Sequence, residues 1–504
     1  MEAVRLLAVA LTTACLLAGC DTPDTQDAKT TGAAERRFGS ITFEPCSLTG
    51  PMSTESVEAQ CARFAVPEDR AKPDGRKIML NMAWLPATQE GAAEPDPVFL
   101  LAGGPGQAAT EVWPQIDGAF AAVRKNRDVI LVDQRGTGQS NPLVCNDAKG
   151  EPAAVAEADT GGASLAELAK QCLAGLDADP RFYTTTEAVQ DLEAVRAALG
   201  VPQVNLIGVS YGTRVAQQYT ARHPDRTRTI VLDGVAPNDL VVGGEFARTF
   251  DRALALQEAR CEQSAACKAR FPTGLRAQLR QLKTKLQAAP VEVDYRDPGT
   301  GEVKRGTLTA DTLTGLSHAF SYMPQLASLL PVVIDEAAKG EYGPLMALSK
   351  LAEASMGGQI ARGMQLSVIC AEDADRYRPD PADADTVLGA ELSRMFFETC
   401  TVWPKGTRPA GFNKPLESPV PALLMSGELD PVTPPEYGER VLKGLPNGRH
   451  VVLRGQAHNV FHIGCMPKLL SQFIESADAK ALDTECLKSV DFVPPFTSFN
   501  GWEP

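Results

Sequence analysis

One short segment, Val204–Arg214, constrains the fold of this chain more than any other. In it an apolar run ends in Gly208-x-Ser210-x-Gly212, and a helical pattern follows over residues 213–223. A serine at such a strand-to-helix turn has a strained backbone and exposes its hydroxyl above the edge of the sheet. Glycines are expected on either side, because a Cβ there would collide with the neighbouring strand and helix. The segment therefore predicts that Ser210 is a nucleophile, placed at a helix N-terminus that favours developing negative charge.

Other short apolar runs of the chain end in similar turns, and helical patterns separate them. Strands that alternate with helices predict a mostly parallel sheet with helices on both faces, which binds its ligands at the carboxyl ends of the strands. The predicted strands are 78–85, 97–102, 128–132, 204–209, 229–234, 421–425 and 449–453, and further helices are predicted over 186–199, where Thr186 is the expected N-cap, and 467–476.

From about residue 237 to residue 415 the pattern becomes mainly helical, with one short strand expected over 291–295. This region is predicted to be a helical cap inserted into the α/β core, with helices over 246–260, 275–288 and 326–338. We expect five parts: a signal peptide over 1–20, a flexible tether over 21–40, the first part of the core over 41–237, the cap over 238–415, and the second part of the core over 416–504.

The serine requires two partners that the chain can supply. A hydroxyl is a poor nucleophile unless a base takes its proton, and the base needs a carboxylate that holds its tautomer. In α/β-hydrolases the order along the chain is serine, acid, histidine, and Ser210, Asp430 and His458 follow that order. Each comes directly after a predicted strand, so all three are expected at the same edge of the sheet. His462 is the competing base, and Asp233, which also follows a strand, is the competing acid.

An acyl-transfer site also needs backbone N–H groups that stabilise the oxyanion. One is expected from Tyr211, the residue after the nucleophile. The other is expected from the loop Gly103-Gly104-Pro105-Gly106, which follows an early strand, and we assign it to Gly104. Glycines in that loop would let the backbone approach the substrate closely.

The first twenty residues predict export. Arg5 precedes an apolar run over residues 6–17, which is too short for an ordinary membrane span. The run leads into Leu17-Ala18-Gly19-Cys20, which resembles the lipobox of bacterial lipoproteins. In that case Cys20 becomes the lipidated first residue, and the lipid is the only membrane anchor; an ordinary secretory signal is the alternative. The net charge of −14 makes nucleic acid an unexpected partner.

The cysteines agree with export. Ten of the twelve remain after Cys15 and Cys20 are set aside, and an even number in an exported chain suggests disulfides. Their connectivity is open, but they fall into near neighbours, so sequential pairing is expected. No cysteine or histidine cluster has the spacing of a zinc site, and we expect no metal. The expected pairs are Cys46–Cys61, Cys145–Cys172, Cys261–Cys267, Cys370–Cys400 and Cys465–Cys486.

Three motifs together resemble one known family. The loop 103–106, the stretch Asp133–Ser140 and the serine turn are similar to those of the prolyl iminopeptidase and tripeptidyl aminopeptidase family of α/β-hydrolases. Residues 427–434 and 455–458, with the Cys465 and Cys486 tail, resemble the C-terminal domain of its secreted tripeptidyl-aminopeptidase branch. Ala102 stands where the family usually has a histidine. The resemblance implies an α/β-hydrolase fold and no cofactor.

The same resemblance implies a serine exopeptidase of the bacterial cell envelope. It would release short peptides or single residues from the free N-terminus of peptide substrates through an acyl-enzyme. A carboxylate should then bind the substrate ammonium group; the candidates are Glu372 and Asp373, with Asp375 as a further possibility. Two other functions stay open: a carboxylic ester hydrolase on the same triad, and a catalytically silent binding lipoprotein.

Overall fold

The computed structural model describes residues 35–50, 56–89, 91, 93–146, 164–356 and 359–501. The predicted signal peptide, Cys20 and most of the predicted tether lie outside these residues. The first strand, β1 (Arg36–Phe38), falls within the segment predicted as tether, so regular structure begins earlier than expected. Within the described ranges, no helix combines the length and the apolar character that a membrane crossing requires.

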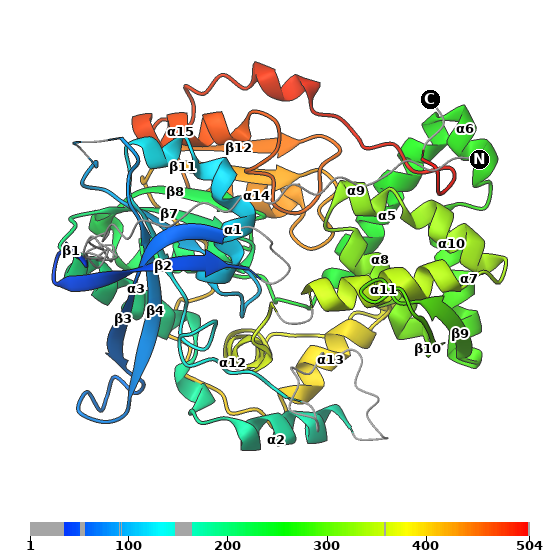
Figure 1. Cartoon of the computed structure of the whole chain (residues 1–504), viewed down its shortest axis with the longest axis horizontal. Helices are drawn as coiled ribbons and strands as arrows, with labels where there is room; N and C mark the ends of the chain where they lie inside the picture. Colours follow the sequence, from blue (N-terminus) through cyan, green and yellow to red (C-terminus); the bar gives the residue numbers. More distant parts are fainter. Residues whose placement is uncertain are drawn as a thin grey trace, which may run out of the picture. The chain divides into compact units, whose positions relative to one another are not determined.

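One mixed sheet forms the core (Figure 1), and this confirms the predicted fold class. Its strand order is β1-β2-β3-β4-β6-β5-β7-β8-β11-β12; the first four are antiparallel, and the six from β6 to β12 in that order are parallel. Strands β1 to β3 were not predicted, because half-exposed antiparallel strands lack the continuous apolar runs that revealed the others. The bounds are β2 (Ile41–Thr49), β3 (Ser56–Pro67), β4 (Lys77–Leu85), β5 (Val98–Leu101), β6 (Val129–Val132), β7 (Val204–Val209), β8 (Thr227–Asp233), β11 (Ala422–Gly427) and β12 (Gly448–Leu453).

The central strands are buried on both faces, because helices cover each side. In β7, Leu206 belongs to one apolar cluster and Ile207 to the other. Side chains of α3 and α4 pack in the first cluster, and side chains of α1 and α15 pack in the second. Helix α3 is capped by Thr184 rather than the expected Thr186. The bounds are α1 (Ala109–Phe120), α2 (Leu165–Gly175), α3 (Thr185–Leu199), α4 (Tyr211–Arg222), α14 (Pro435–Leu442) and α15 (Met466–Ser476).

The region between β8 and β11 is mainly helical, as predicted, and has its own apolar cluster that includes Leu279, Leu313 and Leu330. The helix predicted over 326–338 is two helices, and the strand predicted near residue 291 pairs with an unpredicted partner in a hairpin. The bounds are α5 (Phe246–Gln263), α6 (Ala265–Arg270), α7 (Leu275–Ala288), β9 (Val291–Arg296), β10 (Val303–Leu308), α8 (Ala310–Phe320), α9 (Pro324–Ala327), α10 (Leu330–Ala338), α11 (Gly343–Met356), α12 (Arg362–Glu372) and α13 (Glu391–Thr399).

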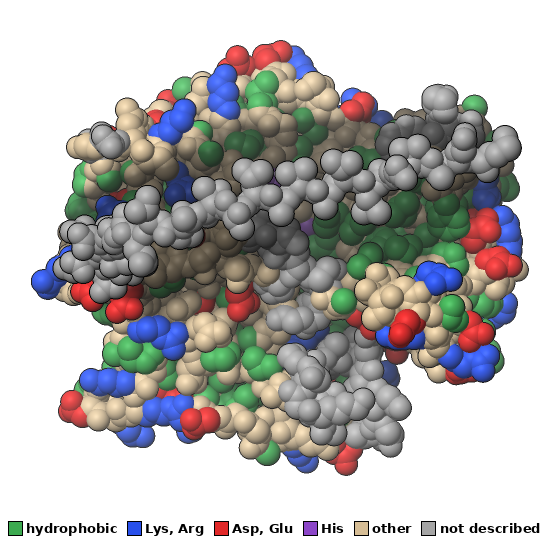
Figure 2. Space-filling view, in the orientation of Figure 1, with side chains coloured by type: hydrophobic (Ala, Val, Ile, Leu, Met, Phe, Trp, Pro, Cys, Tyr) green, Lys and Arg blue, Asp and Glu red, His purple; other side chains and the backbone are tan. Residues whose placement is uncertain are grey.

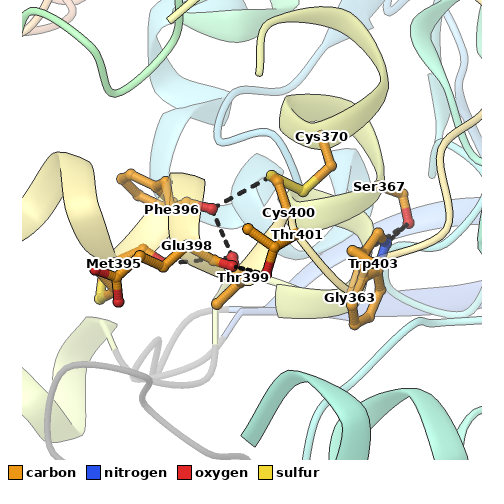
Figure 3. Close-up of a disulfide and its surroundings, with 10 residues drawn as sticks. All are labelled: Gly363, Ser367, Cys370, Met395, Phe396, Glu398, Thr399, Cys400, Thr401 and Trp403. Carbon is orange, nitrogen blue, oxygen red and sulfur yellow. Dashed lines mark hydrogen bonds between the residues drawn. A yellow bond between two sulfur atoms is a disulfide. The ribbon is translucent and has the colours of Figure 1, made fainter. Parts of the chain in front are cut away.

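Five disulfides link the same sequential pairs that the spacing of the cysteines suggested: Cys46–Cys61, Cys145–Cys172, Cys261–Cys267, Cys370–Cys400 and Cys465–Cys486. The bridge from Cys370 to Cys400 joins the end of α12 to the end of α13 (Figure 3). Such links restrict the unfolded chain more than the folded one and so stabilise the fold.

Candidate active site

Ser210 lies at the turn between β7 and α4, at the carboxyl edge of the sheet. Its backbone has a φ of 55° and a ψ of −122°, a strained conformation for a residue other than glycine. A Cβ on Gly208 would lie 2.4 Å from the carbonyl oxygen of Gly212, and a Cβ on Gly212 would lie 2.0 Å from the carbonyl oxygen of Leu101. The serine turn can form only because both flanking residues are glycines.

Asp430 and His458 come together at the ends of β11 and β12. Nδ1 of His458 lies 2.7 Å from Oδ2 of Asp430. The other carboxylate oxygen, Oδ1, accepts hydrogen bonds from the backbone amides of Val432 at 2.9 Å and Thr433 at 2.7 Å. The Thr433 hydroxyl donates to Oδ2 at 2.8 Å and lies 3.1 Å from Nδ1. Because Nδ1 faces the carboxylate, Nε2 is the nitrogen that can accept a proton.

Asp430 and His458 each shift the pKa of the other. Burial alone would raise the pKa of the Asp430 carboxyl, but the charge of His458 and the hydrogen bonds from His458, Thr433 and Val432 outweigh burial and lower it. Burial alone would lower the pKa of the His458 imidazole, but the Asp430 carboxylate and, less strongly, Asp233 outweigh burial and raise it. The arrangement therefore stabilises an imidazolium next to an ionised carboxylate, as the triad chemistry requires.

Asp233, the competing acid, has a different position. Its carboxylate accepts the backbone amides of Val460 at 2.8 Å and Phe461 at 2.9 Å, in the loop that follows His458. Its carbonyl oxygen accepts the Ser210 amide at 2.8 Å. A Cβ on the next residue, Gly234, would lie 2.9 Å from Cε1 of His458. One turn at the end of β8 thus contacts both the nucleophile and the histidine loop.

The two predicted oxyanion donors lie in positions that agree with that role. The backbone amides of Tyr211 and Gly104 have no acceptor among the residues that the structure describes. Gly103 approaches the nucleophile, since a Cβ added there would lie 3.0 Å from Cβ of Ser210. Gly104 has a φ of 106° and precedes Pro105 through a cis peptide bond, so a side chain at this position would be strained.

The acids predicted to bind an ammonium group are both buried at the end of α12. Asp373 pairs with Arg214 at 2.9 Å and with Arg376 at 2.6 Å, so guanidinium groups already occupy both of its oxygens. Glu372 accepts the amide and the hydroxyl of Thr185 at 2.7 and 2.9 Å, and its nearest Arg214 nitrogen lies 3.8 Å away. Burial raises the pKa of Glu372 to about 7, against the opposing effect of Arg214. Asp375, the third possibility, pairs with Arg408 on the surface at 2.7 Å.

The sequence reasoning missed two residues of this region. Thr433 completes the hydrogen-bonded group of Asp430 and His458. Glu111 is half-buried in the first turn of α1, directly after the loop 103–106, and no lysine or arginine in the described ranges pairs with it. Burial, aided by the negative charge of Asp133, raises the pKa of the Glu111 carboxyl. Its only sequence signal is that it is the acidic residue in the first turn of the helix that follows the glycine loop.

Two family models match separate parts of the chain. Residues 96–314 match the family model described as alpha/beta hydrolase fold, and residues 385–486 match the model described as TAP-like protein. The first match includes the glycine loop and Ser210, and the second includes Asp430 and His458. The predicted nucleophile and its predicted partners therefore fall in the regions that resemble these families.

Three relatives cover different shares of the chain. Serine protease Hip1 of Mycobacterium tuberculosis is 25% identical over 498 residues, which cover 90% of this chain and 92% of that protein. Tripeptidyl aminopeptidase of Streptomyces lividans is 30% identical over 215 residues, which cover 40% of each chain. Proline iminopeptidase of Neisseria gonorrhoeae is 29% identical over 151 residues, which cover 29% of this chain and 35% of that protein.

Proposed function

We propose that this chain, which belongs to the α/β-hydrolases and has a TAP-like C-terminal region, is an exported serine exopeptidase that removes short peptides or single residues from the free N-terminus of peptides. The single observation that carries the proposal is the hydrogen-bonded group of Asp430, Thr433 and His458 beside the strained turn of Ser210. The names of the relatives, serine protease, tripeptidyl aminopeptidase and proline iminopeptidase, support a peptide substrate.

In the proposed reaction, Oγ of Ser210 attacks the carbonyl carbon of the scissile peptide bond while Nε2 of His458 takes the hydroxyl proton. The amides of Tyr211 and Gly104 stabilise the oxyanion that forms. The imidazolium then gives its proton to the leaving amine, which leaves an acyl-enzyme on Ser210. Water, deprotonated by His458, hydrolyses the ester and restores the serine.

An aminopeptidase must bind the substrate ammonium group. Asp373 is a poor candidate, because an ammonium group would have to displace one of two guanidinium groups from a buried carboxylate. Glu372 stays a candidate, since its carboxylate has no ion pair among the described residues other than the 3.8 Å contact with Arg214. Glu111 is the better placed acid, because it is only half-buried, lacks a cationic partner in the described ranges and follows the predicted oxyanion loop.

The experiment that tests the proposal compares short peptides with a free amino group with the same peptides acetylated, using the soluble domain that begins after Cys20. Ser210→Ala is the blank. We expect cleavage of the free forms only, with a KM that rises in Glu111→Gln more than in Glu372→Gln while kcat changes less. Equal cleavage of free and acetylated peptides would remove the requirement for an ammonium group.

The two alternatives give different results in the same assays. A carboxylic ester hydrolase would turn over short acyl esters and leave every peptide intact. A silent binding lipoprotein would show no fluorophosphonate labelling that depends on Ser210.

Export and anchoring have their own test. Five disulfides support an oxidising compartment, and Cys20 is the proposed site of the lipid. Full-length protein made in a bacterial host should partition into detergent, and Cys20→Ser should abolish that partition while leaving the protein exported. Detergent partition that persists in Cys20→Ser would contradict lipidation at this cysteine.

A further inference from the structure

Arg362, the first residue of α12, has a positive charge that no described residue of the chain neutralises. Its guanidinium donates one hydrogen bond, to the side-chain oxygen of Gln365 at 2.5 Å. Within the described part of the chain, no carboxylate lies within ion-pair distance of it. An amide oxygen satisfies one N–H of the five that a guanidinium offers and supplies no opposite charge.

The surroundings of Arg362 distinguish it from the other arginines. Burial lowers the pKa of its guanidinium, whereas every other arginine of the described ranges that shows a shift has its pKa raised with the help of a carboxylate partner. The side chain nevertheless keeps part of its surface exposed. A cation that is surrounded by protein, reachable by solvent and unpaired is costly to maintain unless an anion binds there.

Arg362 also lies next to the predicted oxyanion loop. The amide of the preceding residue, Ala361, donates to the carbonyl oxygen of Gly106 at 3.0 Å, and a Cβ on Gly106 would lie 2.9 Å from the carbonyl oxygen of Ala361. The start of α12 is therefore packed directly on the loop that carries Gly104.

The face of α12 that contains Arg362 continues toward the nucleophile. Arg362, Gln365 and Glu372 are spaced by three and seven residues, so they share one face of the helix. At the far end of that face, Glu372 binds the Thr185 hydroxyl, which lies 2.6 Å from the hydroxyl of Tyr211. One end of α12 thus contacts the loop that carries Gly104, and the other end is linked through Thr185 to the side chain of Tyr211, the residue after the nucleophile.

A disulfide and hydrogen bonds tie the helix to neighbouring segments (Figure 3). Cys370 is bonded to Cys400, the indole of Trp403 donates to the Ser367 hydroxyl at 3.1 Å, and that hydroxyl donates to the carbonyl oxygen of Gly363 at 2.7 Å. The amide of Gly363 also binds the carbonyl oxygen of Leu143 at 2.7 Å. A fixed scaffold of this kind presents a charged group without a large loss of entropy on binding.

We propose that Arg362 binds a carboxylate of the substrate, so that the enzyme prefers peptides with a negative charge close to the scissile bond. Two sources share this chemistry: an acidic side chain beside the bond, and the C-terminal carboxylate of a short peptide. A guanidinium can hold either through two parallel hydrogen bonds. The start of α12 adds to the attraction, because Ala361 gives no side-chain cap and the first turn has no acid. The inference rests on the proposed peptidase function, which it narrows to a substrate class.

The test uses four matched peptides with free N-termini: a neutral peptide ending in an amide, the same peptide ending in a carboxylate, and amidated versions with Glu or Gln beside the cleaved bond. In the wild type we expect kcat/KM to be about 10- to 100-fold higher for the member of one pair that has the carboxylate. Arg362→Gln should reduce that ratio to near one, and Arg362→Lys should keep part of it. Whichever pair responds identifies the source of the carboxylate.

The matched control is Arg394→Gln, which removes the same charge from the exposed face of the neighbouring helix α13 and should leave the ratio unchanged. Equal rates within both pairs in the wild type, or ratios that persist in Arg362→Gln, would overturn the proposal. If Arg362→Gln fails to fold, as judged by thermal unfolding, the lysine variant decides: a ratio equal to that of the wild type in both pairs contradicts a bidentate guanidinium site.

A second readout separates this proposal from the peptidase function. If the wild type cleaves no peptide, the same peptides are tested for their ability to slow fluorophosphonate labelling of Ser210. Protection that is stronger with the carboxylate than with the amide or glutamine form, and that Arg362→Gln removes, would support the anion site and contradict only the peptidase function. Equal protection would overturn the anion site.

Discussion

Two buried carboxylates, Asp430 and Asp373, each pair with a cation near the serine turn, and the difference between them separates chemistry from structure. Both have a relative exposure of 0%. Asp430 faces an imidazole, whose second nitrogen can exchange a proton. Asp373 faces Arg214 and Arg376, whose guanidinium groups remain protonated at any pH the protein meets. A buried ion pair can serve acid–base chemistry only when its cation can lose a proton, as an imidazolium can and a guanidinium cannot. A buried acid that pairs with a basic residue is therefore not by itself a sign of a catalytic site.

The largest effect should come from Asp430→Asn. The variant keeps the shape of the side chain but favours the wrong tautomer of His458, so kcat should fall on the order of 10⁴-fold. The measurement is steady-state hydrolysis of the best substrate, with Ser210→Ala as the blank. A loss of less than about tenfold would mean that Asp430 is not the acid and would make Asp233 the next candidate.

Asp373→Asn should lower the stability of the fold rather than remove a catalytic group. Removal of one partner from a buried ion pair leaves Arg214 with only the more distant Glu372 carboxylate, 3.8 Å away, and we expect the free energy of unfolding to fall by about 3–5 kcal/mol. Urea unfolding measures this loss. The control is Asp375→Asn, which breaks an ion pair on the surface and should cost at most about 1 kcal/mol. Unchanged stability with a raised KM would instead return Asp373 to the ammonium site.

Asp233→Asn should reduce activity, but less than Asp430→Asn does. An asparagine oxygen in place of Oδ2 can still accept the amides of Val460 and Phe461, but its NH₂ group then replaces Oδ1 beside the Val460 amide, so the loop that carries His458 loses one hydrogen bond and keeps the others only to a neutral acceptor. We expect kcat/KM to fall about 10- to 100-fold. A loss larger than that of Asp430→Asn would exchange the roles assigned to the two acids.

Thr433→Val tests the hydroxyl that donates a hydrogen bond to the Asp430 carboxylate. The valine preserves the shape and the backbone amide that binds Asp430 but removes the hydroxyl that donates to Oδ2. We expect kcat to fall about tenfold, with little change in KM, because one hydrogen bond to a charged group is lost. An unchanged kcat would show that the backbone amides alone position the carboxylate.

The pH profile should move in a defined direction. Catalysis needs neutral His458, and Asp430 raises the pKa of this imidazole above its usual 6.5. Activity is therefore present above that raised pKa and is lost as the pH falls through it. We expect the acid limb of kcat/KM above pH 6.5 in the wild type, and a limb below pH 6.5 would contradict the assigned direction.

Much of the core could be predicted from the sequence, because parallel strands buried on both faces appear as continuous apolar runs. The runs before Gly103, Ser210 and Asp430 all correspond to strands of one sheet. The cap was harder, since amphipathic helices without strong caps or breaks give weaker signals. Helix α12 was not predicted, although it contains Arg362 and Glu372. The interpretation of Glu372 and Asp373 as open acids failed to anticipate their burial, because Arg214 comes from a segment 158 residues away from Glu372 along the chain.

The strand-to-helix turn at Ser210 follows from the sequence alone, since only glycines fit beside the serine, and so does the order of serine, acid and histidine after successive strands. These are local properties, set by backbone geometry and by the period of apolar residues. The folded chain is needed to see which charges have no opposite charge beside them among the described residues. Glu111 and Arg362 look like any other charged residue in the sequence, and Asp373 looks equally available. The pairing of charges depends on distances of a few ångströms between segments far apart in the chain, and no local pattern encodes those distances.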